Sequence, residues 1–356
     1  MKIAVVAAYA LIGSLAFGTL AGCDQSTHQY SPADVASAIA PNGTPYQRAS
    51  AGMQANRIRA NVNRSWMAPD AATSKDLLYV SDYSGEKNVV DVFSYPDDKQ
   101  VGTITTDMLN PDGLCVDKKG DVWVVNNTPN DNDVVEFKHG GTTPIATLVD
   151  PGESAISCAI DPTTGNLAVT SGTDISGGAG ALAIYKGAKG TPVMYSDSKM
   201  QEMFWCGYDN KGNLFVDGSP SLYVAGFALA ELPKGKKTLA NITLTGGKIN
   251  FPGQVQWDGS TLLIGDQEAQ GNGSPETSAV YQTTGAGGKI LKKITLKRST
   301  DVSQYEVLGS TLLAPNSQDS SFGGGDVLFY KYPAGGASTK KITGSFDYPV
   351  GLVVSP

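Results

Sequence analysis

Polar side chains recur where short apolar segments of this 356-residue chain end, and their types could support chemistry. The residues at these ends are Asp82, Asn126, Asn127, Ser171, Asp217, Asp266 and Asn316. A second group, Asp112, Glu153, Glu202 and Gln254, stands before or within other apolar segments. Carboxylate and amide oxygens are the ligands that Ca²⁺ prefers in proteins. The alternative is that these residues are ordinary polar turn residues that meet water.

Cysteine and histidine offer fewer possibilities. The four cysteines include Cys115, Cys158 and Cys206, which stand before successive turns, and the two histidines are His28 and His139. A disulfide needs Cα atoms within about 7 Å. We expect neighbouring strands to diverge here, so that these cysteines are small buried thiols packed between them. His139 falls in a Lys-His-Gly-Gly turn and is expected to be solvated.

The elements that must position these residues repeat along the chain. A short apolar strand, a turn with Asp or Gly, and a second apolar strand recur at Asp76, Gly120, Gly165, Gly212, Gly259 and Gly309. Spacings of about 44 to 50 residues, with four short strands per unit, are typical of a β-propeller. The sequence therefore predicts an all-β fold of six blades. Equivalent strand ends would then form a ring around one mouth of the central channel.

The end of the chain predicts how the ring closes. Asp347 to Val354 resembles Asn110 to Asp117, which is the first strand of a repeat, whereas the repeat at Asp76 lacks a clean first strand. We therefore expect the C-terminal strand to be the innermost strand of the first blade. Such pairing removes exposed sheet edges.

The first residues differ from the repeats. Residues 1–22 contain Lys2 and an apolar run, as an export leader does. Leu20-Ala-Gly-Cys23 resembles the lipobox of bacterial lipoproteins, which implies that Cys23 is lipidated and anchors the chain to a membrane. The alternative is an ordinary leader with an accidental cysteine. Residues 23–66 are expected to be a flexible tether, and 67–356 the propeller. Ser65-Trp66-Met67 is expected to pack onto the propeller because a Trp in a tether is usually buried.

Charge limits the partners. The formal net charge is −7, and no basic cluster with interleaved aromatic residues is present. Nucleic acid is therefore not an expected partner. The resemblance to a lipobox implies a protein of the bacterial cell envelope, facing the periplasm or the cell surface. We expect a monomer with a protein or glycan ligand.

The repeat region resembles NHL-type and gluconolactonase-like propellers. The resemblance is carried by Asn110-Pro-Asp-Gly-Leu-Cys-Val-Asp117 together with Gly120-Asp-Val-Trp-Val124. It implies a divalent cation at the channel mouth, held by carboxylate and amide side chains from different blades. The residues in suitable places are Glu202, Asp217, Asp266 and Asn126, with Glu153 as an alternative to Glu202. The family's Glu-Gly-Pro start of the first inner strand is replaced here by Tyr348-Pro-Val-Gly351.

Two functional hypotheses follow. The first is a tethered binding or scaffold module for a protein or glycan, with no certain cofactor; a surface lectin-like role is a third, separate possibility. Its ligand would contact the ring of polar residues, including Asp82, Asn127, Ser171, Asn316, Asp112 and Glu153. The second is a metal-dependent lactonase or hydrolase, in which Ca²⁺ would polarise a carbonyl group and activate water.

Overall fold

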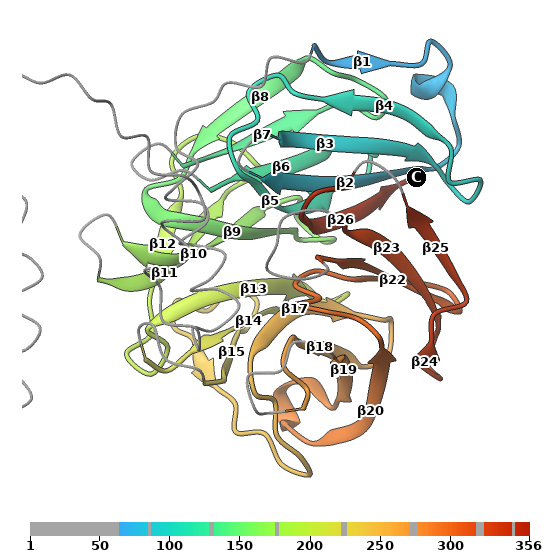
Figure 1. Cartoon of the computed structure of the whole chain (residues 1–356). Helices are drawn as coiled ribbons and strands as arrows, with labels where there is room; N and C mark the ends of the chain where they lie inside the picture. The colour runs from blue at the N-terminus through green and yellow to red at the C-terminus, as the bar shows by residue number, and fades with distance from the viewer. Residues whose placement is uncertain are drawn as a thin grey trace, which may run out of the picture.

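Six β-sheets are arranged as blades around a central channel in the computed structural model of the protein (Figure 1). The structure describes residues 64–84, 87–127, 132–174, 178–221, 226–270, 277–317, 324–343 and 346–356. Leader residues 1–22, Cys23, the tether up to residue 63 and His28 lie outside these ranges. The prediction of an all-β, six-bladed propeller is confirmed. Alternating apolar residues and glycine turns produce these short antiparallel strands.

The first three blades use strands from the first half of the chain. Blade 1 has the order β1 (Trp66–Met67), β4 (Gln100–Ile104), β3 (Lys87–Ser94), β2 (Leu77–Ser84) and β26 (Pro349–Ser355). Blade 2 contains β5 (Pro111–Val116), β6 (Val122–Asn126), β7 (Asp133–Phe137) and β8 (Pro144–Val149). Blade 3 contains β9 (Gly152–Ile160), β10 (Leu167–Asp174), β11 (Ala179–Tyr185) and β12 (Val193–Tyr195).

The last three blades repeat this plan. Blade 4 contains β13 (Glu202–Tyr208), β14 (Leu214–Ser219), β15 (Ala228–Leu232) and β16 (Ala240–Asn241). Blade 5 contains β17 (Pro252–Trp257), β18 (Leu262–Asp266), β19 (Thr277–Thr283) and β20 (Ile290–Lys297), to which β24 (Gly336–Ala337) adds in parallel. Blade 6 contains β21 (Glu306–Leu308), β22 (Thr311–Asn316), β23 (Asp326–Lys331) and β25 (Lys340–Thr343). Two 3₁₀ turns, η1 (Ala71–Thr73) and η2 (Gly285–Gly287), connect strands.

Closure occurs as the sequence predicts. β26 pairs antiparallel with β2, with Leu77 opposite Ser355 and Asp82 opposite Pro349. Figure 1 shows the red C-terminal strand beside the blue β2 at the inner side of blade 1. Ser81 strengthens the pairing, because its Oγ accepts a hydrogen bond of 2.8 Å from Gly351 N and donates one of 2.6 Å to Asp112 O in blade 2.

The core lies between neighbouring blades. Between blades 1 and 2, Tyr79, Val92 and Ile104 pack against Leu114 and Phe137. Similar apolar clusters fill the spaces between the other blades. Each blade buries apolar residues on both faces, so the ring becomes one continuous core when it closes.

The chain segment Ser65 to Met67 packs onto the outer edge of the propeller. β1 begins at Trp66 and pairs with β4 at the outer edge of blade 1, and Ser65 Oγ accepts a hydrogen bond of 2.8 Å from Thr105 N. The expectation that Trp66 would be buried is wrong, because this residue is 48% exposed. Met67 packs against the core in its place. Strand alternation is the reason: only one of two consecutive side chains can face the core.

Candidate functional site

The strand-end residues hold the loop that leads into the innermost strand of their own blade. Asp82 Oδ1 accepts a hydrogen bond of 2.6 Å from Tyr348 N, and its Oδ2 accepts one of 3.0 Å from Asp347 N. In blade 5, Asp266 accepts hydrogen bonds of 3.1 and 3.2 Å from the N–H groups of Phe251 and Asn250. These carboxylates satisfy backbone donors that the strand ladder leaves unpaired.

Amide and hydroxyl side chains occupy the equivalent places in three other blades. Asn126 Oδ1 accepts from Leu109 N at 3.1 Å in blade 2, and Asn316 Oδ1 accepts from Thr300 N in blade 6 at 2.5 Å. Ser171 differs, because its Oγ donates a hydrogen bond of 2.6 Å to Asp150 Oδ2 just before the inner strand of blade 3. The predicted ring therefore contains residues that fasten loops to blades.

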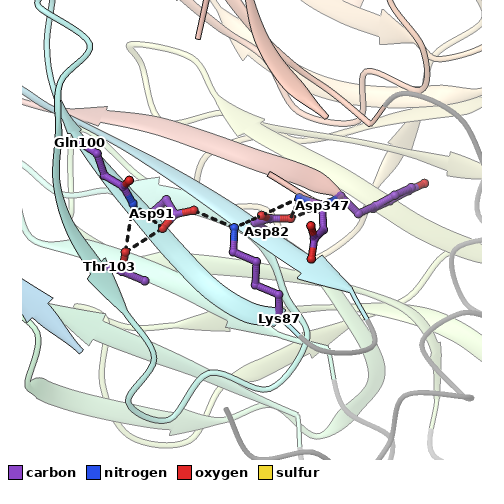
Figure 2. A network of polar contacts seen from close by, with 7 residues as sticks. Asp82, Lys87, Asp91, Gln100, Thr103 and Asp347 are labelled. Carbon is purple, nitrogen blue, oxygen red and sulfur yellow. Dashed lines mark hydrogen bonds and ion pairs between the residues drawn. The ribbon is translucent and has the colours of Figure 1, made fainter. Parts of the chain in front are cut away.

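Blade 1 extends this arrangement into an ion-pair network (Figure 2). Lys87 Nζ lies 2.6 Å from Asp82 Oδ2 and 3.1 Å from Asp91 Oδ2. Gln100 and Thr103 donate hydrogen bonds of 2.9 and 2.8 Å to the other oxygen of Asp91. Burial raises the pKa of Asp82 to about 6 although Lys87 and the backbone N–H groups lower it. Burial alone would lower the pKa of Lys87, and the two carboxylates raise it above its ordinary value.

Asp217 has a different position from the other strand-end carboxylates. Asp82, Asn126 and Asp266 lie opposite the first residue of the inner strand, which is a proline each time. In blade 4 the equivalent residue is Gly218, which lies opposite Met203, the second residue of β13. Asp217 therefore lies one residue earlier in its strand than Asp82, Asn126 and Asp266 do in theirs. Its Oδ1 accepts a hydrogen bond of 3.0 Å from Trp205 N, its Oδ2 has no partner, and burial raises its pKa well above the ordinary value.

Two inner-strand residues of the predicted ring, Asp112 and Glu202, are buried. Asp112 Oδ2 accepts a hydrogen bond of 3.3 Å from Asn127 Nδ2, whereas Asp112 Oδ1 has no partner. Burial raises the pKa of Asp112 to about 7. Glu202 is buried at the start of β13 and lies opposite Ser219. Glu153 lies in β9, opposite Thr173.

The predicted calcium ligands belong to three different blades. Asn126 is in blade 2, Glu202 and Asp217 are in blade 4, and Asp266 is in blade 5. Within the described ranges, the group of acidic, His or Cys residues whose ligand atoms lie within 4.8 Å of one another is Asp117, Asp121 and Glu136. Lys119 lies 3.7 and 4.0 Å from two of these carboxylates. The calcium site and the lactonase activity stay predictions.

Two expectations about cysteine and histidine are wrong. Cys115 and Cys158 form a disulfide with a Cα–Cα distance of 5.6 Å, so they are not separate thiols. The inner strands β5 and β9 converge toward the channel, which brings the two residues within bonding reach. Cys206 remains a buried thiol as expected, and burial raises its pKa to about 12.

His139 is half-buried and bonded at both ring nitrogens. Its Nδ1 lies 2.6 Å from Ser355 Oγ in β26, and its Nε2 lies 3.0 Å from Ser74 O. Ser355 Oγ also donates a hydrogen bond of 2.6 Å to Gly120 O. The turn of blade 2 that carries His139 thus binds the closing strand of blade 1, which the turn sequence alone did not indicate.

A cavity of about 230 Å³ occupies the central channel. Its lining comes from all six innermost strands and the segment before β21, and includes Gln254, Gln256, Trp257, Gln304, Tyr305 and Glu306. The lining residues that end β5, β9, β13 and β17 are half-buried, whereas those in the middle of the strands are buried apart from Gln254. The cavity is therefore more open at the end opposite to the predicted ring.

Side chains in the channel satisfy part of the inner backbone. Gln304 reaches blade 2, where it accepts a hydrogen bond of 3.1 Å from Leu114 N and donates one of 2.8 Å to Leu114 O. It passes Gly351, where an added Cβ would lie 2.7 Å from Gln304 Oε1. Glu306 Oε2 accepts from Val354 N at 2.7 Å, and burial raises the pKa of Glu306 to about 8.

Three polar atoms among the cavity residues have no hydrogen-bond partner within the described part of the protein. They are the hydroxyl of Tyr305, Oε1 of Gln254 and Nε1 of Trp257. Sequence reasoning placed Gln254 at the other mouth and did not identify Tyr305 or Trp257. A signal in the sequence was the presence of two glutamines, Gln254 and Gln256, in a segment whose neighbours are mainly apolar.

Comparison with known proteins supports the fold only. No family model matches the sequence, and no curated protein does. A chain from the crystal structure of a nidogen/laminin complex matches with a TM-score of 0.61 and 10% identity, over 79% of this chain and 99% of that chain. Hydrazine synthase of Kuenenia stuttgartiensis matches with a TM-score of 0.48 and 13% identity, over 67% of this chain and 66% of that chain. In the described residues we find no helix long and apolar enough to cross a membrane.

Proposed function

We propose that the protein is a binding module, exported and tethered to a bacterial membrane, whose ligand occupies the central channel. The observation that carries this proposal is the cavity of about 230 Å³ in the central channel, whose lining includes Gln254, Gln256 and Trp257 of strand β17. Concave sites with a few placed polar groups are the usual form of ligand sites. Because most of the lining comes from the six innermost strands, little ordering is needed on binding.

Two observations support export and tethering. Leu20-Ala-Gly-Cys23 has the pattern of a lipidation site. The disulfide between Cys115 and Cys158 is typical of a protein that folds outside the reducing cytosol. The chain enters the propeller at β1, the outermost strand of blade 1. A tether attached there leaves the channel free to face a ligand.

The anchor is tested by Cys23→Ser in the full chain. Lipidation through several acyl chains gives stable membrane attachment. The variant is therefore expected either to leave the membrane fraction or to retain its leader. A variant that is processed and fractionates like the wild type would exclude the anchor. Tethering and ligand binding are separate parts of the proposal and are tested separately.

Occupancy of the channel is tested by native mass spectrometry of the full chain, extracted from membranes in mild detergent. We expect a bound mass on the wild type that is lost in Trp257→Arg, because an arginine at the cavity blocks it and adds an unpaired charge. Trp66→Arg is the matched control, since Trp66 is 48% exposed on the outer edge of blade 1. A bound mass that survives Trp257→Arg, or none on the wild type, contradicts a channel ligand.

A further inference from the structure

The outer strands of the six blades differ in charge. The outermost strands of blades 1 to 4, which are β1, β8, β12 and β16, contain no lysine or arginine, and neither does β4 next to β1. In contrast, β20 of blade 5 contains Lys292, Lys293 and Lys297, and β25 of blade 6 contains Lys340 and Lys341. The net charge of −7 therefore hides a basic region on one side of the ring.

We propose that the outer side of blade 5 is the surface through which the propeller contacts a membrane of anionic lipids. We call this surface the basic rim and define it by five exposed residues on β20 and at its ends, which are Lys289, Leu291, Lys292, Lys297 and Arg298. The basic rim lies outside the channel, so this inference goes beyond the proposed ligand site. It rests on the proposed function only in that a membrane is close to the protein.

The charges of the basic rim are available to a partner. Among the residues that the structure describes, its four cations make no ion pair. The sequence from Thr277 to Thr300 also contains no acidic residue. Lys340 and Lys341 of blade 6 differ, because they lie against Asp98 and Asp326. An anionic surface would therefore be attracted most strongly to β20.

Protection of a sheet edge does not account for these lysines. Lysine on an edge strand discourages pairing with another chain, but the edge of β20 is already partly covered. β24 pairs with it at Leu296 and Lys297, and Figure 1 shows these two strands side by side. At its other end, Ile290 N donates a hydrogen bond of 2.8 Å to Thr245 O. β12 is the terminal strand of its sheet and has exposed apolar residues instead of lysines.

The exposed Leu291 favours a lipid surface over a soluble polyanion. This residue is 51% exposed and lies beside Lys292, where the pairing of β19 with β20 shifts register. Peripheral proteins bind bilayers through basic side chains at the headgroups together with apolar side chains that enter below them. A nucleic acid or an acidic polysaccharide would offer Leu291 no apolar partner.

The lipid anchor and the basic rim would act together. Attachment raises the local concentration of the membrane surface, so even a weak electrostatic contact is occupied. The chain enters the propeller at β1 in blade 1, which packs against blade 6. Outer strands face away from the central channel of a propeller. Contact through the basic rim would therefore orient the molecule and leave both mouths of the channel open to solvent.

The test is sedimentation with vesicles of phosphatidylglycerol or of phosphatidylcholine. It uses the full chain with Cys23→Ser, so that no acyl chain contributes, and a retained leader adds the same affinity to every variant. We expect binding to phosphatidylglycerol that is lost in about 0.5 M salt, because salt screens exposed charges. Each lysine near an anionic surface contributes about fivefold to binding, so Lys292→Gln with Lys297→Gln should bind about 25-fold more weakly.

The matched control is Lys186→Gln with Lys189→Gln, which removes two exposed lysines from blade 3. Four results would overturn the proposal: no binding to phosphatidylglycerol, equal binding to the two lipids, equal weakening in the two double variants, or binding that the basic rim gives to dextran sulfate but not to vesicles. The last result would identify a soluble polyanion as the partner. The anchor fails separately, because a high-salt wash releases an electrostatic contact from membranes but does not release a lipid anchor.

Discussion

Asp82, Asn126 and Asp266 perform the same task in three blades, because each accepts backbone hydrogen bonds from the loop before an inner strand. Their side chains are buried, and their oxygens are already used. A residue type suited to metal binding is therefore also suited to satisfying backbone donors. Asp217 departs from this arrangement because of its register and keeps an unpartnered oxygen.

The Lys87 network gives the first prediction. Lys87→Met would leave the buried carboxylates of Asp82 and Asp91 without their cation. Breaking one partner of a buried ion pair typically costs about 3–5 kcal/mol. We expect a loss of that order in the free energy of unfolding, measured by urea denaturation at pH 7. The control is Lys340→Met, since Lys340 is 47% exposed beside Asp98 and should contribute about 1 kcal/mol or less. Equal losses in the two variants would contradict the role of the network.

Asp217 gives a prediction with a pH signature. Ser81 and Thr170 have the same position in blades 1 and 3 that Asp217 has in blade 4. Their hydroxyl groups donate hydrogen bonds to carbonyl groups of the next blade, Asp112 O and Phe204 O. By analogy, we expect the corresponding acceptor for Asp217 to be Gly253 O of blade 5. If Asp217 is protonated, its carboxyl O–H can donate a hydrogen bond to this carbonyl. In Asp217→Asn the amide N–H can donate the same hydrogen bond at any pH, because it does not need to take up a proton.

The unfolded-state pKa of Asp217 is near 3.8 and its folded pKa is well above that. Its contribution to stability is therefore full below pH 3.8 and is lost as pH rises. We expect Asp217→Asn to be more stable than the wild type at pH 8 by at least about 1.4 kcal/mol, the value of one pKa unit. The two should be similar at pH 3.5. Measurements in chelator and in millimolar Ca²⁺ also test the predicted metal site, since a bound ion would stabilise only the wild type.

The sequence identified most of these polar residues but not what they do. The sequence comparison grouped Asp217 with Asp82 and Asp266 because each is the polar residue that ends the second strand of a repeat. Asp217 follows its turn glycine Gly212 by five residues, whereas Asn126 follows Gly120 by six, so Gly218 has the equivalent position in blade 4. The register shift near the start of the inner strand is shared with blades 1, 2 and 5 and does not set Asp217 apart. The disulfide was missed because the distance between β5 and β9 depends on the closed ring.

At the scale of strands, β26 has the largest effect on the fold, because it supplies the inner edge of blade 1 and contacts blades 2 and 6. Leu352 packs with Val80 and Phe329, and Glu306 binds Val354 N. The sequence predicted this pairing because the repeat unit is incomplete at both ends of the region. The outer strands were also predictable from their alternation, whereas β24 was not, because two residues carry no periodic pattern.

Leu352→Ala is the prediction at this scale. Leu352 is 0% exposed, and truncation of a buried Leu typically costs about 2–5 kcal/mol. The matched control is Leu291→Ala, since Leu291 lies in strand β20 and is 51% exposed. That change should alter the free energy of unfolding by about 0.5 kcal/mol or less. Similar melting temperatures for the two variants would refute the importance of closure by β26.

At the scale of the whole molecule, buried carboxyl groups determine how stability depends on pH. The folded pKa values of Asp82, Asp112 and Glu306 are raised to about 6, 7 and 8 from ordinary values of 3.8, 3.8 and 4.5. The folded protein therefore binds more protons than the unfolded chain between about pH 4 and 8. Stability from these groups is full at low pH and is lost as pH rises through 6 to 8.

We therefore expect the melting temperature to fall between pH 5 and pH 8. In Glu306→Gln and Asp112→Asn this dependence should be weaker, because neither replacement titrates. The measurement is a series of thermal unfolding curves in buffers of equal ionic strength. Stability that rises from pH 5 to 8, or an unchanged slope in both variants, would contradict the argument. Exposed Asp70→Asn is a suitable control for a change of one charge.

Closure by β26 also has a consequence for timing. Gly351 N binds Ser81 Oγ across 270 residues of sequence. At about 5–20 residues per second, the ribosome needs on the order of ten seconds to a minute to make the chain between them. During that time blade 1 can form its outer hairpins but has no inner neighbour. The first blade to be synthesised is thus the last to be completed, and a chaperone that shields the free edge of β2 would act in this interval.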